Sequence, residues 1–358
     1  MRIVHVVGAR PNVVKMAPLI AALRARFPDW PTAIVHTGQH YDRMMSDIFL
    51  EELAVPEPDH VLGVGSGSHS EQIARVLERL EPVLRAEHPE LVVVPGDVNS
   101  TLGAALCAAK LGISVAHVES GLRSFDRSMP EETNRIAADH LSELCFLHCG
   151  EAIHNLSAEG VGESRMKFVG NTMIDTLVAL EERIRERGTA AALGLDAGSF
   201  LLVTLHRPAL VDGPLLGEAM SRLADVGREL PVVFPLHPRT RKMLPGAEYP
   251  GIILTEPVGY LDFLSLEADA AAVLTDSGGI QEETTYLGVP CFTLRDSTER
   301  PVTIRSGTNT LLGLEPARVA EIPELLRSRR TGSHGESPRP YLWDGKAAER
   351  AADVLADW

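Results

Sequence analysis

The stretch Asp276-Ser277-Gly278-Gly279-Ile280-Gln281-Glu282-Glu283 joins an apolar, strand-like run at 270–274 to a helix-like run at 280–287. Two consecutive glycines at a strand-to-helix turn let the backbone approach a ligand closely. The start of the helix offers unpaired N–H groups and a partial positive charge, which suit a phosphate. Glu283 follows about one turn into the helix, where its carboxylate can accept hydrogen bonds from ribose hydroxyls. The stretch therefore predicts half of a site for a nucleotide diphosphate.

Strand-like and helix-like segments alternate along the rest of the chain. Near-continuous apolar strands separated by helices, such as those predicted at 71–85 and 100–110, indicate parallel sheets covered on both faces. The predicted strands are 3–7, 33–36, 91–94, 114–118 and 144–148 in the first half, and 200–205, 232–235, 252–255, 271–275 and 291–294 in the second.

The length of 358 residues suggests two domains. We expect an α/β fold of two doubly wound, Rossmann-like domains, 1–170 and 171–338, that face each other across a cleft. Ligands of such sheets bind beyond the carboxyl ends of the strands. The run 328–340 is rich in Arg, Gly, Ser and Pro, which favours a surface linker. The final segment, 339–358, predicts a C-terminal helix that packs back on the first domain.

Composition limits the classes of partner and compartment. With 34 basic and 49 acidic residues, the net charge is −15, which argues against general nucleic-acid or anionic-membrane binding. No apolar run reaches the ~18–20 residues of a membrane helix, and the N-terminus has the pattern of a first strand rather than of a signal peptide. Four scattered cysteines predict a reduced, cytoplasmic protein. Cys145, His148 and Cys149 are close in sequence, but no second ligand pair follows, so we do not expect a metal site.

Three carboxylates follow strands or loops of the first predicted domain. Asp97 comes after strand 91–94, Glu119 directly after strand 114–118, and Glu131 in the motif MPEETNR. Acids clustered in a cleft raise one another's pKa and can serve as acid and base. Asp97 could instead be a helix N-cap, and Glu131 a first-turn residue favoured by the helix dipole. A purely structural role is harder to assign to Glu119, because a glutamate directly after a buried strand costs free energy unless it has a function.

Basic side chains follow the first strand. Arg10 and Lys15 are preceded by a single glycine, Gly8, so the segment lacks the three spaced glycines of a dinucleotide fingerprint. The two cations could contact a phosphate or a substrate hydroxyl. They could equally belong to a solvated helix start.

Basic side chains also follow three strands of the second domain. His206-Arg207 ends one predicted strand, His237-Pro238-Arg239 ends the next, and Arg300 follows the last long strand. A lone histidine at a strand end is more often structural than catalytic. Two histidine–arginine pairs that face a phosphate loop favour anion binding.

Together these residues resemble one family, the non-hydrolysing UDP-N-acetylglucosamine 2-epimerases, which have the two-domain fold of the B-type glycosyltransferases. The matching motifs span nearly the whole chain in the expected order. They are GARPNVVKMAPL (8–19), TGQHYDRMMSDIF (37–49), PGDVNSTLGA (95–104), HVESGLRSFDRSMPEETNR (117–135), VGNTMIDTL (169–177), TLHRP (204–208), PLHPRTR (235–241), LTDSGGIQEE (274–283), RDSTERP (295–301) and GTNTLLG (307–313).

The resemblance implies inversion at C2 of the sugar of UDP-N-acetylglucosamine, giving UDP-N-acetylmannosamine. The C2 proton is weakly acidic, because no carbonyl adjoins it. An enzyme can oxidise a neighbouring carbon transiently with a nicotinamide, or it can eliminate UDP across C1–C2 and add it back to the other face. The missing dinucleotide fingerprint disfavours the first route. In the second route UDP must stay bound while the sugar is a glycal.

The resemblance also implies roles for individual residues. Asp97, Glu119 and Glu131 would form the acid/base set, and His206 would stabilise the departing phosphate. Phe263 would lie near the uracil, with core packing as the alternative. The UDP-sugar contacts implied are Arg10, Lys15, Arg207, His237, Phe263, Ser277, Gly278, Gly279, Glu283 and Arg300. No metal or organic cofactor is implied, and a homodimer that serves polysaccharide or amino-sugar biosynthesis is expected.

The chain departs from the family pattern at two places. A Glu-Asn element usually follows the His-Arg pair, whereas Pro208-Ala209 follows here, and Val302 stands where the family tends to have glutamate. Either loss could alter domain closure, sugar specificity or regulation. Some bacterial members bind a second UDP-N-acetylglucosamine as an activator near the segment that corresponds to Gln39-His40 and Arg207, and the loss of Glu-Asn disfavours that here.

Three other functions stay open at this point. A hydrolysing relative would release N-acetylmannosamine and UDP, a glycosyltransferase would use the same fold and donor, and a weak UDP-sugar-binding protein would lack turnover. The three carboxylates favour elimination over transfer, and no acceptor site is recognisable. Intact Asp97, Glu119, Glu131 and His206 argue against a protein that only binds.

Overall fold

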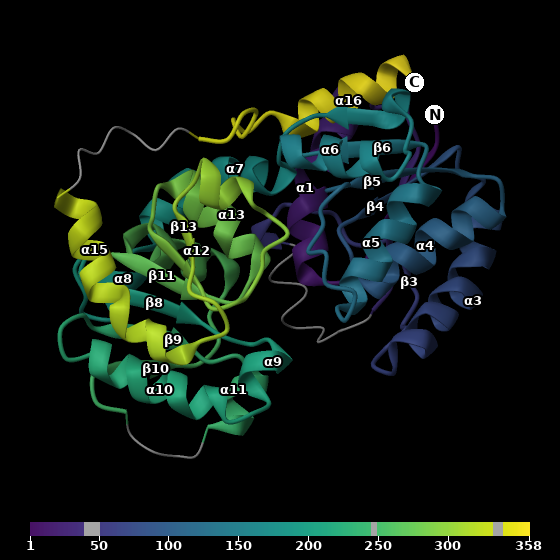
Figure 1. Cartoon of the computed structure of the whole chain (residues 1–358). Coiled ribbons are helices and arrows are strands. Elements are labelled where there is room, and N and C mark those ends of the chain that lie inside the picture. Colours follow the sequence, from purple (N-terminus) through teal and green to yellow (C-terminus); the bar gives the residue numbers. More distant parts are fainter. Residues whose placement is uncertain (39–50, 245–248, 332–338) are drawn as a thin grey trace. The chain divides into compact units, whose positions relative to one another are not determined.

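The computed structural model describes residues 1–38, 51–244, 249–331 and 339–358. Its contacts divide the chain into two compact units (Figure 1): Met1–Ala179 with Tyr341–Trp358, and Leu180–Pro340. The division falls within helix α7 (Thr172–Arg187), later in the chain than the predicted break after residue 170. The C-terminal segment belongs to the first unit, where helix α16 (Ala347–Asp357) contacts helix α1 (Arg10–Arg26).

The first unit contains a seven-stranded sheet in the order β3-β2-β1-β4-β5-β6-β7, and all its strand pairs are parallel. Its strands are β1 (Ile3–Val7), β2 (Thr32–His36), β3 (His60–Val61), β4 (Leu91–Pro95), β5 (Ser114–Val118), β6 (Leu144–Leu147) and β7 (Met166–Phe168). Its other helices are α3 (His69–Glu87), α4 (Asn99–Lys110), α5 (Pro130–Leu141) and α6 (Gly150–Ala158).

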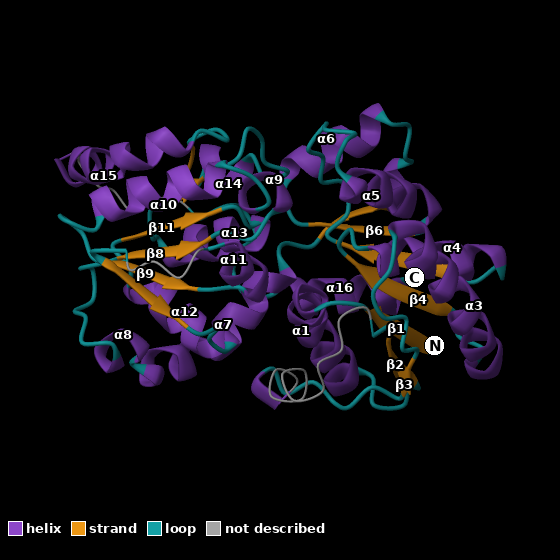
Figure 2. Ribbon diagram, turned by 90° about the horizontal axis from the view of Figure 1, so that it is seen from below, coloured by secondary structure: helices purple, strands orange, loops and turns teal. Residues whose placement is uncertain are grey.

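Helices cover both faces of this sheet. Alternate strand residues such as Val4 and Val92 pack with Val76 of α3 and Ala104 of α4 in one buried cluster. Helices α1 and α16 lie over the opposite face (Figure 2). This double cover explains why the strands are apolar throughout rather than alternating.

The second unit has a six-stranded sheet in the order β10-β9-β8-β11-β12-β13, again parallel throughout. Its strands are β8 (Leu201–Thr204), β9 (Val232–Pro235), β10 (Ile252–Thr255), β11 (Ala272–Thr275), β12 (Cys291–Thr293) and β13 (Asn309–Leu311). Its helices are α8 (Thr189–Ala192), α9 (Pro208–Val211), α10 (Leu215–Val226), α11 (Pro238–Met243), α12 (Tyr260–Asp269), α13 (Gly278–Leu287), α14 (Val302–Arg305) and α15 (Ile322–Thr331).

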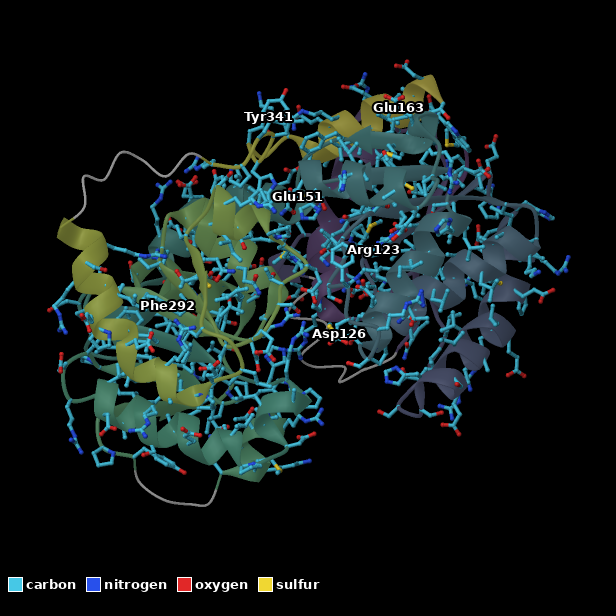
Figure 3. The ribbon with its side chains drawn as sticks, in the orientation of Figure 1. Arg123, Asp126, Glu151, Glu163, Phe292 and Tyr341 are labelled. Carbon is cyan, nitrogen blue, oxygen red and sulfur yellow. The ribbon has the colours of Figure 1, made fainter. Side chains whose placement is uncertain are left out.

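Two apolar clusters hold this unit together, one on each side of the sheet. Helices α10 and α15 contribute to the first cluster, which includes Phe292 of β12 (Figure 3). Helices α8 and α12 contribute to the second, which includes Phe200 and Leu202. Figure 2 shows α10 and α12 on opposite sides of the strands.

All ten predicted strands are confirmed, with small shifts at their ends. The sequence did not predict β3, β7 and β13, which are two or three residues long and only partly buried, so no continuous apolar run marks them. The predicted linker 328–340 began too early, because α15 continues to Thr331. Within the described ranges, no helix is long and apolar enough to cross a membrane.

The two sheets have the same kind of switch point. The strand order reverses between β1 and β4 in the first unit and between β8 and β11 in the second. Ligands of doubly wound sheets bind outside the carboxyl ends of the strands at such points. Of the predicted site residues, Arg10, Asp97, His206 and Ser277 come shortly after these four strands.

Candidate active site

Glu119 follows the end of β5 in an unusual backbone conformation. Its φ of +70° lies in the left-handed region, which a residue with a side chain enters at a cost of roughly 1–3 kcal/mol. Its carboxylate forms an ion pair with the ammonium of Lys15, which α1 supplies. Both side chains are buried, with exposed fractions of 9% and 10%. Such strain beside a buried ion pair is typical of a functional site.

The turn after β1 places Lys15. The side-chain carbonyl of Asn12 accepts hydrogen bonds from the backbone N–H groups of Gly8 (3.2 Å) and Ala9 (3.1 Å), and its amide donates to the carbonyl of Pro95 (3.2 Å). These bonds connect the start of α1 to the end of β4. Arg10, the first residue of α1, is exposed.

Gly96 lets the lysine and the glutamate meet. Its φ is +66°, and a Cβ there would lie 3.2 Å from Nζ of Lys15 and 3.7 Å from Oε2 of Glu119. A larger residue would therefore crowd both partners of the ion pair. The structure thus brings together Lys15, Glu119 and the Gly96 turn. The sequence had allowed a solvated helix start as the alternative for Lys15.

Asp97 follows this turn and forms an ion pair with Arg135 of α5. The other guanidinium nitrogen of Arg135 lies 2.7 Å from Oε2 of Glu132. The backbone carbonyl of Asp97 accepts from the amide of Asn134 at 2.9 Å. The alternative of an N-cap is wrong for Asp97, because the residue that caps α4 is Val98.

The neighbouring glutamates of α5 differ in environment. Glu132 is buried and accepts from the N–H and the hydroxyl of Ser124 and from the N–H of Phe125, each at 2.9 Å. Glu131 is half-buried in the first helical turn, as its structural alternative predicted. Sequence reasoning missed Glu132 and Arg135. Their i, i+3 spacing in PEETNR was the available signal.

In the second unit, His206 follows β8 and Asp276 follows β11. One carboxylate oxygen of Asp276 accepts from the N–H groups of His206 and Arg207, each at 2.8 Å. The other oxygen lies 3.1 Å from Nδ1 of His206. Burial raises the pKa of Asp276, but the hydrogen bonds and charge of His206 outweigh burial and hold that pKa below its ordinary value.

This contact orients the imidazole, because Nδ1 facing Asp276 leaves Nε2 on the opposite edge of the ring. His237 lies beside it, with ring centroids 5.8 Å apart. His237 is exposed at the N-terminus of α11 and accepts from the N–H of Arg239 at 3.2 Å. The two predicted histidines are therefore neighbours. The sequence did not predict that Asp276 positions His206.

The predicted strand-to-helix turn is present. Gly278 begins α13, and a Cβ there would lie 2.5 Å from a guanidinium nitrogen of Arg300. Arg300 is buried, 3.1 Å from Glu282 and 3.4 Å from Glu299. The glycine therefore lets a guanidinium lie against the start of the helix. Ser277 precedes the helix and Gly279 is half-buried in its first turn.

Glu283 is buried in α13 and accepts a hydrogen bond from the hydroxyl of Tyr260 at 2.8 Å. Burial raises the pKa of Glu283 to about 7, with the Tyr260 hydrogen bond opposing and the charge of Glu282 adding to the rise. Phe263, one turn after Tyr260, is half-buried and packs on the apolar cluster under α12. Its position accords with the core-packing alternative.

The two departures from the family pattern occupy ordinary structural positions. Pro208 and Ala209 are exposed at the start of the short helix α9. Val302 is buried at the start of α14. Gln39 and His40, which bear on the predicted activator site, lie outside the described residues.

Cys145, His148 and Cys149 are buried at β6 and the turn after it. Where the structure describes the chain, no group of three or more histidine, cysteine, aspartate or glutamate residues is arranged to hold a metal ion. All four cysteines are buried, and none forms a disulfide bond with another.

Comparisons with known proteins bear on the chemistry of these residues. A family profile described as UDP-N-acetylglucosamine 2-epimerase matches residues 23–356. The chain is 40% identical to a UDP-N-acetylglucosamine 2-epimerase of Methanocaldococcus jannaschii, over 99% of each chain. It is 38% identical to a UDP-2,3-diacetamido-2,3-dideoxy-D-glucuronate 2-epimerase of Pseudomonas aeruginosa, again over 99% of each chain.

The fold is also that of solved 2-epimerase structures. The crystal structure of the Methanocaldococcus jannaschii UDP-GlcNAc 2-epimerase in complex with UDP-GlcNAc and UDP superposes with a TM-score of 0.88 at 38% identity, covering 100% of both chains. This match confirms the predicted α/β architecture of two Rossmann-like units.

Proposed function

Because the chain belongs to the UDP-N-acetylglucosamine 2-epimerase family, we propose that it interconverts UDP-N-acetylglucosamine and UDP-N-acetylmannosamine by eliminating UDP and adding it back. The observation that carries the chemistry is Glu119, held in a left-handed turn against Lys15. A carboxylate in that setting is positioned before substrate arrives. Asp97 and Glu131 complete the acid/base set.

The proposed reaction balances without an external oxidant. A carboxylate of the set takes the proton from C2, the electrons of that bond form the C1=C2 double bond, and the C1–O bond breaks toward the β-phosphate of UDP. The reverse addition restores the C1–O bond and delivers a proton to the opposite face of C2. His206, oriented by Asp276, stabilises the charge that develops on the phosphate.

The remaining predicted residues hold the substrate. We assign the diphosphate to Arg10, Ser277, Gly278 and Gly279, the ribose to Glu283 and the uracil to Phe263, and we expect secondary contacts from Lys15, Arg207, His237 and Arg300. Free N–H groups at the start of α13 suit a diphosphate. We also propose a cytoplasmic homodimer.

One experiment tests this proposal. The protein is incubated with UDP-N-acetylglucosamine in D2O, without nicotinamide or acceptor, and followed by NMR. Deuterium at C2 in a mixture of the gluco and manno nucleotides is the expected result. Free N-acetylmannosamine with UDP would indicate a hydrolysing enzyme instead, and an unchanged sugar would refute both.

A second substrate class has specific support. The Pseudomonas aeruginosa relative is named for a diacetamido glucuronate nucleotide, and its identity to this chain is close to that of the first relative. This chain also has Val302 where the resemblance leads us to expect a glutamate, and Pro208-Ala209 where it leads us to expect a Glu-Asn element. Fewer carboxylates would suit a sugar that carries its own. Comparing kcat/KM for the two nucleotide sugars decides between them.

A further inference from the structure

A buried hydrogen-bonded chain links three elements of the first unit. Asp139 of α5 is fully buried, and its Oδ1 lies 2.7 Å from Nδ1 of His117 on β5. Its Oδ2 accepts from the N–H of Gly121 at 3.1 Å and lies 2.8 Å from a guanidinium nitrogen of Arg123. On the far edge of the ring, Nε2 of His117 lies 2.7 Å from the carbonyl oxygen of Gly96.

The two partners of the His117 ring are acceptors. Burial raises the pKa of Asp139, but the charges and hydrogen bonds of His117 and Arg123 outweigh burial and hold that pKa below its ordinary value. An ionised carboxylate and a backbone carbonyl are both acceptors only. Nδ1 and Nε2 of His117 therefore each face an acceptor oxygen. Arg123 (Figure 3) also pairs with Glu159 at 2.6 Å.

These bonds bracket Glu119. His117 precedes it by two residues and Gly121 follows it by two, and both are bound to Asp139. Between them, the hydroxyl of Ser120 donates to the carbonyl of His117 at 2.7 Å. The strained φ of Glu119 is thus fixed on both sides. Without these bonds the turn could relax, and the carboxylate would turn away from Lys15.

The same imidazole reaches the second carboxylate-bearing turn. Gly96, whose carbonyl it binds, directly precedes Asp97. The N–H of Gly96 donates to the carbonyl of Val118, directly before Glu119, at 2.9 Å. One histidine therefore connects the turns that present the two carboxylates.

We propose that Asp139 and His117 are positioning residues that hold the Asp97 and Glu119 turns in the arrangement that proton transfer at C2 requires. The proposal rests on the function proposed above. Neither side chain is accessible, so neither touches the substrate. Misplacing a reacting group by about 1 Å can cost on the order of 100-fold in rate, which makes such an effect measurable.

The test uses three variants of the full chain. His117→Asn keeps a hydrogen-bond donor near the position of Nδ1 and loses the bond to Gly96. His117→Gln keeps a donor near the position of Nε2, close to Gly96, and loses the bond to Asp139. Asp139→Asn weakens the hydrogen bonds to the Glu119 turn. We expect kcat for C2 exchange to fall roughly 10- to 100-fold in each, while KM for UDP-N-acetylglucosamine changes little.

His5 supplies the matched control. It is fully buried in β1 of the same sheet, and neither ring nitrogen has a hydrogen-bond partner in the described part of the chain. His5→Gln should change the thermal stability and leave kcat unaltered. Equal losses of kcat in His5→Gln and His117→Gln, or an unchanged kcat in folded His117 and Asp139 variants, would overturn the proposal.

A second measurement does not depend on turnover. A crystal structure of Asp139→Asn should show Glu119 outside the left-handed region or its carboxylate separated from Lys15. If both remain as in the parent chain, the positioning role is refuted, whatever the activity. Failure of the parent chain to exchange C2 would count against the proposed function, and this structure would still decide the role of Asp139.

Discussion

Each of the two units buries the side chain of a predicted site glutamate, Glu119 in the first and Glu283 in the second, and the two are stabilised in different ways. Glu119 has a strained backbone and a cation, Lys15, as its partner. Glu283 lies within regular helix, receives a hydrogen bond from the phenol of Tyr260, and has a pKa raised to about 7. A nearby cation favours the ionised form of a carboxylate, whereas burial alone favours the neutral form. The first arrangement suits chemistry on the sugar, and the second suits recognition of hydroxyl groups.

Of the substitutions at these sites, Glu119→Gln should have the largest effect. The amide keeps the shape and removes the base, and a positioned acid or base typically contributes about 10²–10⁴-fold. C2 exchange should therefore fall by about that factor or more. UDP binding, measured by calorimetry, should be retained, because Glu119 is not among the predicted UDP contacts. Persistent exchange would mean that Glu119 is not the base.

Asp276→Asn tests the partner of His206 in the second unit. The change removes the anion that faces Nδ1 and lets the imidazole adopt the other tautomer. We expect kcat to fall roughly 10- to 100-fold, by the scale of losses seen when a group that orients a histidine is removed. Asp212→Asn is the control, because Asp212 is an exposed ion-pair partner of Arg239. Similar kcat values for Asp276→Asn and Asp212→Asn would mean that Asp276 does not contribute to catalysis.

Glu283→Gln should show the opposite pattern to Glu119→Gln. The amide still accepts a hydrogen bond, but it loses the charge that strengthens bonds from ribose hydroxyls, a difference of about 1–2 kcal/mol. The dissociation constant for UDP should therefore rise by about tenfold, with kcat at saturation little changed. If Glu283→Gln bound UDP normally but turned over slowly, Glu283 rather than Glu119 would be the residue that acts on the sugar.

Local sequence signals predicted the strands, the turns after them and the residues placed there. They did not predict which side chains meet across the fold. Arg135 reaches Asp97 and Asp139 reaches His117 only because α5 packs beside the ends of β4 and β5. Asp276 reaches His206 because β8 and β11 are neighbours in the strand order. Such pairs depend on the strand order and on which helices pack together, and the pattern of residues along the chain does not specify either directly.

The smallest expected effect is a pH dependence of binding affinity. It distinguishes the role of Glu283 from that of Glu119 without a comparison of reaction rates. Because the pKa of Glu283 is about 7, its carboxylate is ionised above that pH and protonated below it. A ribose hydroxyl binds better to the ionised form, so affinity should weaken several-fold as the pH falls from 8 to 6. The ligand should be UDP-N-acetylglucosamine rather than UDP, since a terminal phosphate itself titrates near pH 6.

This pH experiment needs a background without turnover, which Glu119→Gln provides. Calorimetric titrations of Glu119→Gln should show the loss of affinity at low pH, and the double variant Glu119→Gln with Glu283→Gln should not. The difference between the two proteins isolates the ionisation of Glu283 from that of the other titratable groups. An identical pH dependence in both proteins would mean that Glu283 is not the group whose ionisation supports binding. The difference in environment between Glu119 and Glu283 would then have no consequence for binding.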